Sequence, residues 1–296
     1  MFWGTMRVSV PKRPLLCLPA PSYYHACRSL TGLLTASARG NYSTSQQPAT
    51  ASLPPRWLSE VKTRVGKCIT FGMNNEQTKD ATTILESIAR DWRELVAGSE
   101  GFLTAPGRRG LFRQAVVWGE MDIKGHVNNV VYNRYAESGR VLWSKNYATH
   151  IDPTHKKEWK ELMTSRGVGL ILRSIKTDFK FPMTYPDRVT VYHKLATEPT
   201  SATDSFVLDV MILSELHQRP AARCVEDIVV YDYQKAKKAP LKPFMVDAFR
   251  ETWRLQEEAK VSNSRRVHVL LKRVRSLEQE TWDRPDAVED MGSGTR

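Results

Sequence analysis

Hydrophobic positions in the second half of the chain recur at every second residue, which is the period of a β-strand with one face in a core. Four segments show this alternation: residues 168–181, 189–195, 206–212 and 224–233. The alternation slips phase near Arg173 in the first segment, which predicts a β-bulge. In the third segment the intervening residues are apolar as well, so we expect that strand to be buried on both faces.

A helical period precedes these strands. Between about residues 128 and 147, apolar side chains such as Val131, Tyr135 and Leu142 lie on one face, with few helix-breaking residues among them. A short β-prone run, residues 112–118, comes before this helix. The order of strand, long helix and four strands predicts an α+β fold in which one helix packs against an antiparallel sheet.

Helical patterns also flank the sheet-forming region. Residues 60–110 form a predicted helical lead-in, because their apolar residues recur at helical intervals up to Trp92. The spacing of Thr83 and Glu86 is that of a capping box, which predicts a helix start at this point. The sheet-forming domain is then expected to occupy residues 111–240.

Two further helices are predicted in residues 241–282, after Pro243, followed by a disordered tail at 283–296. The second of them is a basic amphipathic helix. Its basic residues are Arg265, Arg266, Lys272, Arg273 and Arg275. We interpret this helix as an appendage that packs on the core and keeps a solvated charged face. The alternatives are contact with RNA, with a membrane surface or with a large assembly.

Charge is distributed unevenly along the 296 residues, whose net charge is +12. Glu60 is the first acidic residue, and six positive charges precede it. A segment that is rich in Arg and Ser and free of acidic residues is typical of a mitochondrial transit peptide. We therefore expect residues 1–59 to be a presequence and the protein to reside in the mitochondrial matrix. A disordered basic tail is the alternative.

Several classes of site are excluded by their missing motifs. The sequence has no GxSxG, HExxH, GxGxxG or GxxxxGK[ST] pattern and no CxxC pair. Cys68 and Cys224, the two cysteines beyond the presequence, are far apart. No metal site and no organic cofactor are expected.

The segment with the clearest candidate chemistry joins the first strand to the long helix. Asp122 stands on this connection, and Gly125 allows a tight turn. His126, Asn128 and Asn129 follow at the helix entrance, where backbone N–H groups are unpaired and the helix dipole is positive. Such N–H groups can polarise a carbonyl, and a nearby carboxylate can attack it or activate water. These residues indicate acyl transfer or hydrolysis.

Each of these residues also has a structural interpretation. Asn128 can simply cap the helix, and Asp122 can cap the loop. His126 taken alone is more often structural than catalytic. Glu137 and Arg140, three residues apart on the helix, can form an ion pair, which we favour slightly over a catalytic role for Glu137.

At these residues the sequence resembles the hotdog-fold thioesterases, in the branch that is similar to 4-hydroxybenzoyl-CoA thioesterase, and we take it for a mitochondrial, fungal-type form. The matching residues are Glu120, Asp122, Gly125, His126, Val127, Asn128, Asn129, Tyr132, Tyr135, Glu137 and Arg140. Glu120 stands where an Asp is common in the family. The resemblance implies a hotdog fold, an antiparallel sheet wrapped around a long central helix, with N- and C-terminal helical extensions outside the family region.

The resemblance also implies roles for individual residues. Asp122 would be the catalytic carboxylate, and the backbone N–H of Asn129 would polarise the thioester carbonyl. The remaining implied site residues are His126 and Glu137 as catalytic groups and Gly125, Asn128 and Tyr132 as substrate-binding residues. Members of this family are usually homodimers or homotetramers with the active site between subunits.

The first hypothesis is therefore a mitochondrial thioesterase that hydrolyses an acyl-CoA or acyl-carrier thioester to a free acid and a thiol. The alternative is a hotdog scaffold without catalysis in a large mitochondrial assembly such as the mitoribosome. A dehydratase or isomerase of acyl thioesters is the third and weakest hypothesis, because the motif resembles the thioesterase branch.

Overall fold

An antiparallel sheet forms the centre of the protein. The computed structural model describes residues 53–54 and 56–289, so the predicted presequence lies almost entirely outside the described residues. The strands are β1 (Gln114–Ala115), β2 (Val168–Phe179), β3 (Arg188–Leu195), β4 (Ser205–Ser214), β5 (Arg219–Asp232) and β6 (Lys237–Lys238). They are ordered β1-β3-β4-β5-β2, and β6 pairs with β5. A register shift between Leu172 and Ser174 confirms the predicted bulge.

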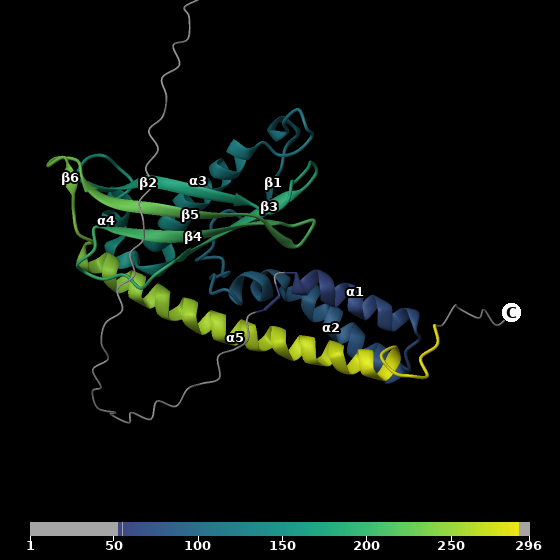
Figure 1. Ribbon diagram of the computed structural model, residues 1–296. Helices are drawn as coiled ribbons and strands as arrows, with labels where there is room; N and C mark the ends of the chain where they lie inside the picture. The colour runs from purple at the N-terminus through teal and green to yellow at the C-terminus, as the bar shows by residue number, and fades with distance from the viewer. Residues whose placement is uncertain (1–52, 55, 290–296) are drawn as a thin grey trace, which may run out of the picture. The chain divides into compact units, whose positions relative to one another are not determined.

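Helix α3 (Asn129–Asn146) lies against one face of this sheet (Figure 1). Tyr132, Tyr135 and Ala136 of α3 share a buried cluster with Val191 of β3 and Val210 of β4. This arrangement confirms the predicted α+β hotdog fold. The β-prone run before α3 forms only the two-residue β1, followed by the 3₁₀ turn η2 (Trp118–Glu120).

A second apolar cluster fills the far end of the helix–sheet interface. After α3, the chain continues through η3 (Tyr147–Ile151), η4 (Pro153–His155) and α4 (Lys156–Glu161). Its aromatic rings form five pairs whose centroids lie 4.5–6.0 Å apart. The rings are those of Trp143, Tyr147, Trp159 and Phe249. This cluster joins α3 to α5 (Pro243–Thr281).

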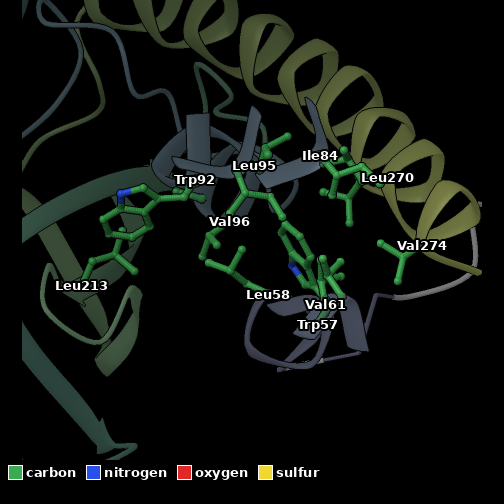
Figure 2. Close-up of a cluster of buried hydrophobic side chains, with 14 of the residues drawn as sticks. Trp57, Leu58, Val61, Ile84, Trp92, Leu95, Val96, Leu213, Leu270 and Val274 are labelled. Atoms are coloured by element: carbon green, nitrogen blue, oxygen red, sulfur yellow. The ribbon is translucent and has the colours of Figure 1, made fainter. Parts of the chain in front are cut away.

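The opposite face of β3 and β4 is covered by helices of the same chain. These are α1 (Trp57–Thr70), α2 (Asn75–Arg93), the π-helical turn η1 (Glu94–Gly98) and the second half of α5. Figure 2 shows Trp92 of α2 beside Leu213 of β4, and Leu270 and Val274 of α5 near Ile84. Met211 and Leu213 are fully buried on this side, which confirms burial on both faces for the second half of β4, whereas Val207 and Asp209 in its first half are half-buried.

Helix α2 begins at Asn75, not near Thr83 as the sequence spacing predicted. The Asn74 side chain accepts hydrogen bonds from the N–H groups of Glu76 and Gln77, and the Gln77 side chain accepts one from the Asn74 N–H. The capping box therefore lies at residues 74–77, where Asn and Gln take the places of Thr and Glu. Thr83 lies inside the helix, where its hydroxyl donates to the carbonyl of Lys79.

The C-terminal region is one helix of 39 residues, so the prediction of two helices was wrong. The interruption in its apolar pattern contains neither Gly nor Pro to end the helix. The first half packs through Phe249 on the sheet cluster, and the second half packs through Leu270 on α1 and α2. Between them, the Ser264 hydroxyl donates to the Ser99 carbonyl at 3.1 Å. The two apolar patterns are thus two contact surfaces of one continuous helix, one on the sheet cluster and one on α1 and α2.

Within residues 53–54 and 56–289, no helix is long and apolar enough to cross a membrane. The same residues contain no cluster of three or more His, Cys, Asp or Glu that could hold a metal ion. Cys68 and Cys224 are buried and unpaired with each other.

Candidate functional site

The connection between η2 and α3 is a tight, hydrogen-bonded loop, residues 121–127. The Asp122 N–H donates to the His126 carbonyl at 2.7 Å, and the Gly125 N–H donates to the Asp122 carbonyl at 3.0 Å. Gly125 has a φ of 73°, a conformation that residues with a side chain rarely adopt. This turn holds Asp122 and His126 at the entrance of α3, as the sequence predicted for this segment.

The Asp122 carboxylate is half-buried and only partly engaged. Its Oδ1 accepts the N–H groups of Lys124 at 2.8 Å and His126 at 3.4 Å. Among the described residues, its Oδ2 accepts no hydrogen bond. Asp122 therefore closes the loop with one oxygen, and the other oxygen has no donor among the described residues.

The start of α3 provides an unpaired donor next to this loop. The Asn128 side chain caps the helix by accepting the Val130 N–H at 3.1 Å, and the Asn128 carbonyl accepts the Val131 N–H. Within the described part of the chain, the Asn129 N–H has no acceptor. A free N–H at a helix start carries partial positive charge and can bind a developing oxyanion. Asp122, His126, Asn128 and Asn129 thus lie within eight consecutive residues.

Glu120 anchors the loop from the other side. Its Oε2 accepts the Tyr135 hydroxyl at 2.6 Å and the Val117 N–H at 2.9 Å, and its carbonyl accepts the Asn128 N–H at 2.9 Å. Burial and the hydrogen bond to Glu120 raise the pKa of Tyr135 far above its usual value, so its hydroxyl stays protonated. The Oε2 atom of Glu120 thus links η2 to α3 through these two donors.

Tyr132, predicted to bind substrate, is 2% exposed. Its hydroxyl accepts the Met183 N–H at 3.1 Å, and burial raises its pKa. The Met183 carbonyl in turn accepts the Val127 N–H at 2.9 Å. Tyr132 thus ties α3 to the β2–β3 connection, and its hydroxyl is occupied by the backbone.

Glu137 lies apart from the other predicted site residues. It is exposed and stands eight residues after Asn129, about 12 Å along a helix that rises 1.5 Å per residue. The predicted ion pair between Glu137 and Arg140 is wrong, since Arg140 instead pairs with the carboxylate of Glu226 on β5. The physical reason is burial: Glu226 is fully buried and needs a countercharge, whereas Glu137 is solvated.

The sequence analysis did not identify the buried polar pair of His193 and Glu226. The Nε2 of His193 on β3 lies 3.6 Å from Glu226 Oε2, and both side chains are fully buried. Gly139 makes room for them, because a Cβ there would lie 2.8 Å from His193 Cε1. A signal was present in the sequence, since Glu226 and His193 both occupy core-facing positions of alternating strands.

An apolar rim surrounds the entrance of α3; we define it as Trp118, Ile123, Val130 and Tyr185. The exposed fractions are 75% for Trp118, 103% for Ile123 and 62% for Val130. The ring of Tyr185 lies edge-on to Trp118, with centroids 6.1 Å apart. Large apolar side chains that gather at one place on a surface indicate a binding or subunit contact.

Comparison with known families gives one match for the region that contains the site. A family model described as the thioesterase-like superfamily matches residues 116–249, from the residue after β1 to the second turn of α5. All the candidate residues described above lie within this range. A search of curated proteins found no significant match.

Among solved structures, similar chains include three thioesterases. A Thermus thermophilus thioesterase complexed with coenzyme A and Zn is 22% identical, with 52% of this chain and 97% of that chain covered and a TM-score of 0.39. A DHNA-CoA thioesterase from Staphylococcus aureus is 15% identical, with 51% of this chain and 94% of that chain covered and a TM-score of 0.41. A 1,4-dihydroxy-2-naphthoyl-CoA thioesterase from Synechocystis is 19% identical, with 48% and 95% covered and a TM-score of 0.39.

Proposed function

We propose that this chain is a member of the thioesterase-like superfamily that hydrolyses an acyl-CoA or acyl-carrier thioester. The observation that carries the proposal is the pairing of a half-free carboxylate, Asp122, with the unpaired N–H of Asn129 in one loop. The match of residues 116–249 to a thioesterase-like model supports thioesters as the substrate class.

In this reaction the thioester carbonyl accepts the Asn129 N–H, which stabilises the negative charge that develops on its oxygen. Asp122 takes a proton from a water molecule as that water attacks the carbonyl carbon. The C–S bond then breaks, the thiolate receives a proton, and the free acid leaves. In the covalent variant, Asp122 attacks the carbonyl itself, and water hydrolyses the acyl-Asp122 anhydride. Both routes yield one acid and one thiol per water consumed.

A thiol-release assay tests this proposal. The full-length chain is incubated with acyl-CoAs of different chain length and polarity, and free thiol is measured. Asp122→Asn keeps an oxygen that can accept the Lys124 and His126 N–H groups but removes the basic charge. We expect it to lose roughly 10²-fold or more in kcat. Asp178→Asn, at an exposed carboxylate of β2, is the matched control. Absence of thiol release from every acyl-CoA, or full activity of Asp122→Asn, contradicts the proposal.

We infer that the active form is a homodimer or homotetramer in which a second copy covers the apolar rim. Two features support this: the rim is exposed, and β2 is an edge strand of the sheet. Residues 162–164 cover the start of β2, where the Leu170 N–H donates to the Leu162 carbonyl, and the rest of this edge offers backbone groups for pairing with another strand. Light scattering measures the mass in solution, and Ile123→Lys is expected to shift it toward the monomer. A monomeric wild-type protein contradicts this inference.

The acid-free composition of residues 1–59 supports a mitochondrial location. The test is a fluorescent reporter fused to these residues and compared with a form in which the arginines are changed to glutamines. Import that depends on the arginines is the expected result, and a cytosolic wild-type fusion contradicts it.

A non-catalytic scaffold role remains the second candidate, favoured by the helices that lie outside the matched region. Helices α1 and α2 and the second half of α5 share a buried cluster with the outer face of β3 and β4, and these helices lie outside residues 116–249. Co-sedimentation of the full-length chain with mitochondrial ribosomes tests this role. Saturable binding by a chain that releases no thiol would favour the scaffold over the hydrolase.

Contact with RNA or a membrane through the basic helix receives less support from the contacts. Arg266 pairs with Asp91 at 2.7 Å, Arg273 pairs with Asp80, and Arg275 pairs with Glu278. Of the five basic residues, only Arg265 and Lys272 have no carboxylate partner among the described residues. Most of the positive charge is thus used within the chain, which agrees with the interpretation of a packed appendage.

A further inference from the structure

Glu120 is the point at which three segments around the candidate site meet. Its side chain accepts hydrogen bonds from the Val117 N–H, two residues after β1, and from the Tyr135 hydroxyl in the second turn of α3. Its carbonyl holds the N–H of Asn128, the residue that caps α3. Asp122 follows only two residues later. The position of Asp122 relative to the helix entrance therefore depends on Glu120.

We propose that Glu120 and Tyr135 form a positioning pair that sets the distance between the Asp122 carboxylate and the Asn129 N–H. This proposal rests on the proposed hydrolase function for its catalytic consequence, but its structural content does not. Glu120 is a positioning residue because its Oε2 accepts the Tyr135 hydroxyl of α3, whereas both hydrogen bonds of the Asp122 carboxylate come from its own loop. The two neighbouring carboxylates thus have different roles.

The length of the Glu120 side chain is essential to this role. Tyr135 is 5% exposed, and its hydroxyl reaches Glu120 Oε2 at 2.6 Å. An aspartate is shorter by one carbon–carbon bond, about 1.5 Å. It would leave the buried hydroxyl of Tyr135 without an acceptor unless the loop moved toward α3.

A small movement of the loop is sufficient to affect catalysis. Apart from Glu120, the loop is fixed to the rest of the chain by the Val127 N–H, which donates to Met183. Loss of the Glu120 side-chain contacts would leave its first half held by the packing of Met121 on the buried cluster and by the hydrogen bond from the Asn128 N–H to the Glu120 carbonyl. A misplacement of about 1 Å at reacting groups can reduce a rate by as much as 10²-fold.

Side-chain length and charge can be separated by substitution. Glu120→Gln keeps the length and an oxygen that accepts both donors, so we expect kcat within about threefold of wild type. Glu120→Asp keeps the charge but not the length, and Tyr135→Phe removes the donor while keeping the ring. We expect each of these to lower kcat about tenfold with KM unchanged within twofold, as the loss of one hydrogen bond predicts. The double variant Glu120→Asp/Tyr135→Phe should be no worse than either single variant.

The second measurement does not require activity. Hydrogen–deuterium exchange of the full-length chain follows the amides of residues 121–128. We expect about tenfold faster exchange in Glu120→Asp and Tyr135→Phe, and near wild-type exchange in Glu120→Gln. Tyr233→Phe, at a half-exposed tyrosine next to β5, is the control and should change neither readout.

The outcomes separate the two proposals. If the wild-type chain releases no thiol, the hydrolase proposal fails, and the exchange data alone decide the positioning pair. Unchanged exchange in both Glu120→Asp and Tyr135→Phe overturns the pair. A loss of kcat in Glu120→Gln as large as in Glu120→Asp also overturns it, because the charge of Glu120 would then act in the reaction directly.

Discussion

The buried pair of Arg140 and Glu226 gives the sharpest prediction for stability. Glu226 has no exposed side-chain surface, and the Arg140 side chain is 16% exposed. Removing one partner of such a pair leaves an uncompensated buried charge, which costs about 3–5 kcal/mol. We therefore expect Glu226→Leu and Arg140→Met each to lower the free energy of unfolding by about that amount. Since domains are stable by about 5–15 kcal/mol, either variant approaches the limit of folding.

The double variant Arg140→Met/Glu226→Leu distinguishes burial of charge from loss of packing. It removes both charges and keeps apolar groups of similar volume, a change that is often neutral or stabilising by about 1–4 kcal/mol. We expect it to restore most of the stability that each single variant loses. The control is Glu137→Gln, at an exposed residue of the same helix, with an expected change within about 0.5 kcal/mol.

Urea unfolding of the full-length chain, followed by tryptophan fluorescence, measures these differences. Trp143 is a suitable reporter, because its ring lies 6.4 Å from that of His193 beside the pair. Two results would refute the reasoning: a loss below about 1 kcal/mol in both single variants, or a double variant whose loss equals the sum of the single losses. Either would mean that the pair contributes no coupling between α3 and β5.

Three smaller predictions follow from other contacts. Gly125→Ala places a side chain at a φ of 73° with no atom within 4 Å of the new Cβ, so thermal unfolding should show only the backbone cost of about 1–2 kcal/mol. Gly139→Ala brings a Cβ within 2.8 Å of His193 Cε1, and overpacking should cost about 1–3 kcal/mol in urea unfolding. The hydrogen bond from Arg64 lowers the pKa of Glu278 below its usual value. The contribution of Glu278 to stability should therefore be present above its ordinary pKa and disappear as pH falls through the lowered one. In a pH series of melting temperatures, Glu278→Gln should lose stability at neutral pH but not at acidic pH; a constant difference would contradict this.

The central fold was predictable because its signals are local. The alternation in the four strands and the slip near Arg173 each depend on residues close in sequence, and both appear in the structure. The loop motif around Asp122 is also local, so its turn and the cap at Asn128 could be expected from the sequence.

The long-range pairs were not predictable in the same way. Arg140 has an acidic residue three positions away in sequence, yet it pairs with Glu226 on a strand 86 residues later. Only the packing of α3 on the sheet decides between the two acids, since it removes Glu226 from water and leaves Glu137 in it. The continuous α5 was missed for a related reason, because its two apolar stripes contact different parts of the fold.

The helices outside the hotdog region restrict how copies of the chain can associate. Tyr192 and Leu213 lie on the outer face of β3 and β4 and are buried by α1, α2 and α5 of the same chain. A second copy cannot pack on that part of the sheet without displacing these helices. Among the described residues, these helices cover neither the edge of β2 nor the apolar rim at the entrance of α3. Any homo-oligomer that keeps this fold must therefore form away from the outer face of β3 and β4. A dimer through the β2 edge would leave the α1–α2–α5 core intact.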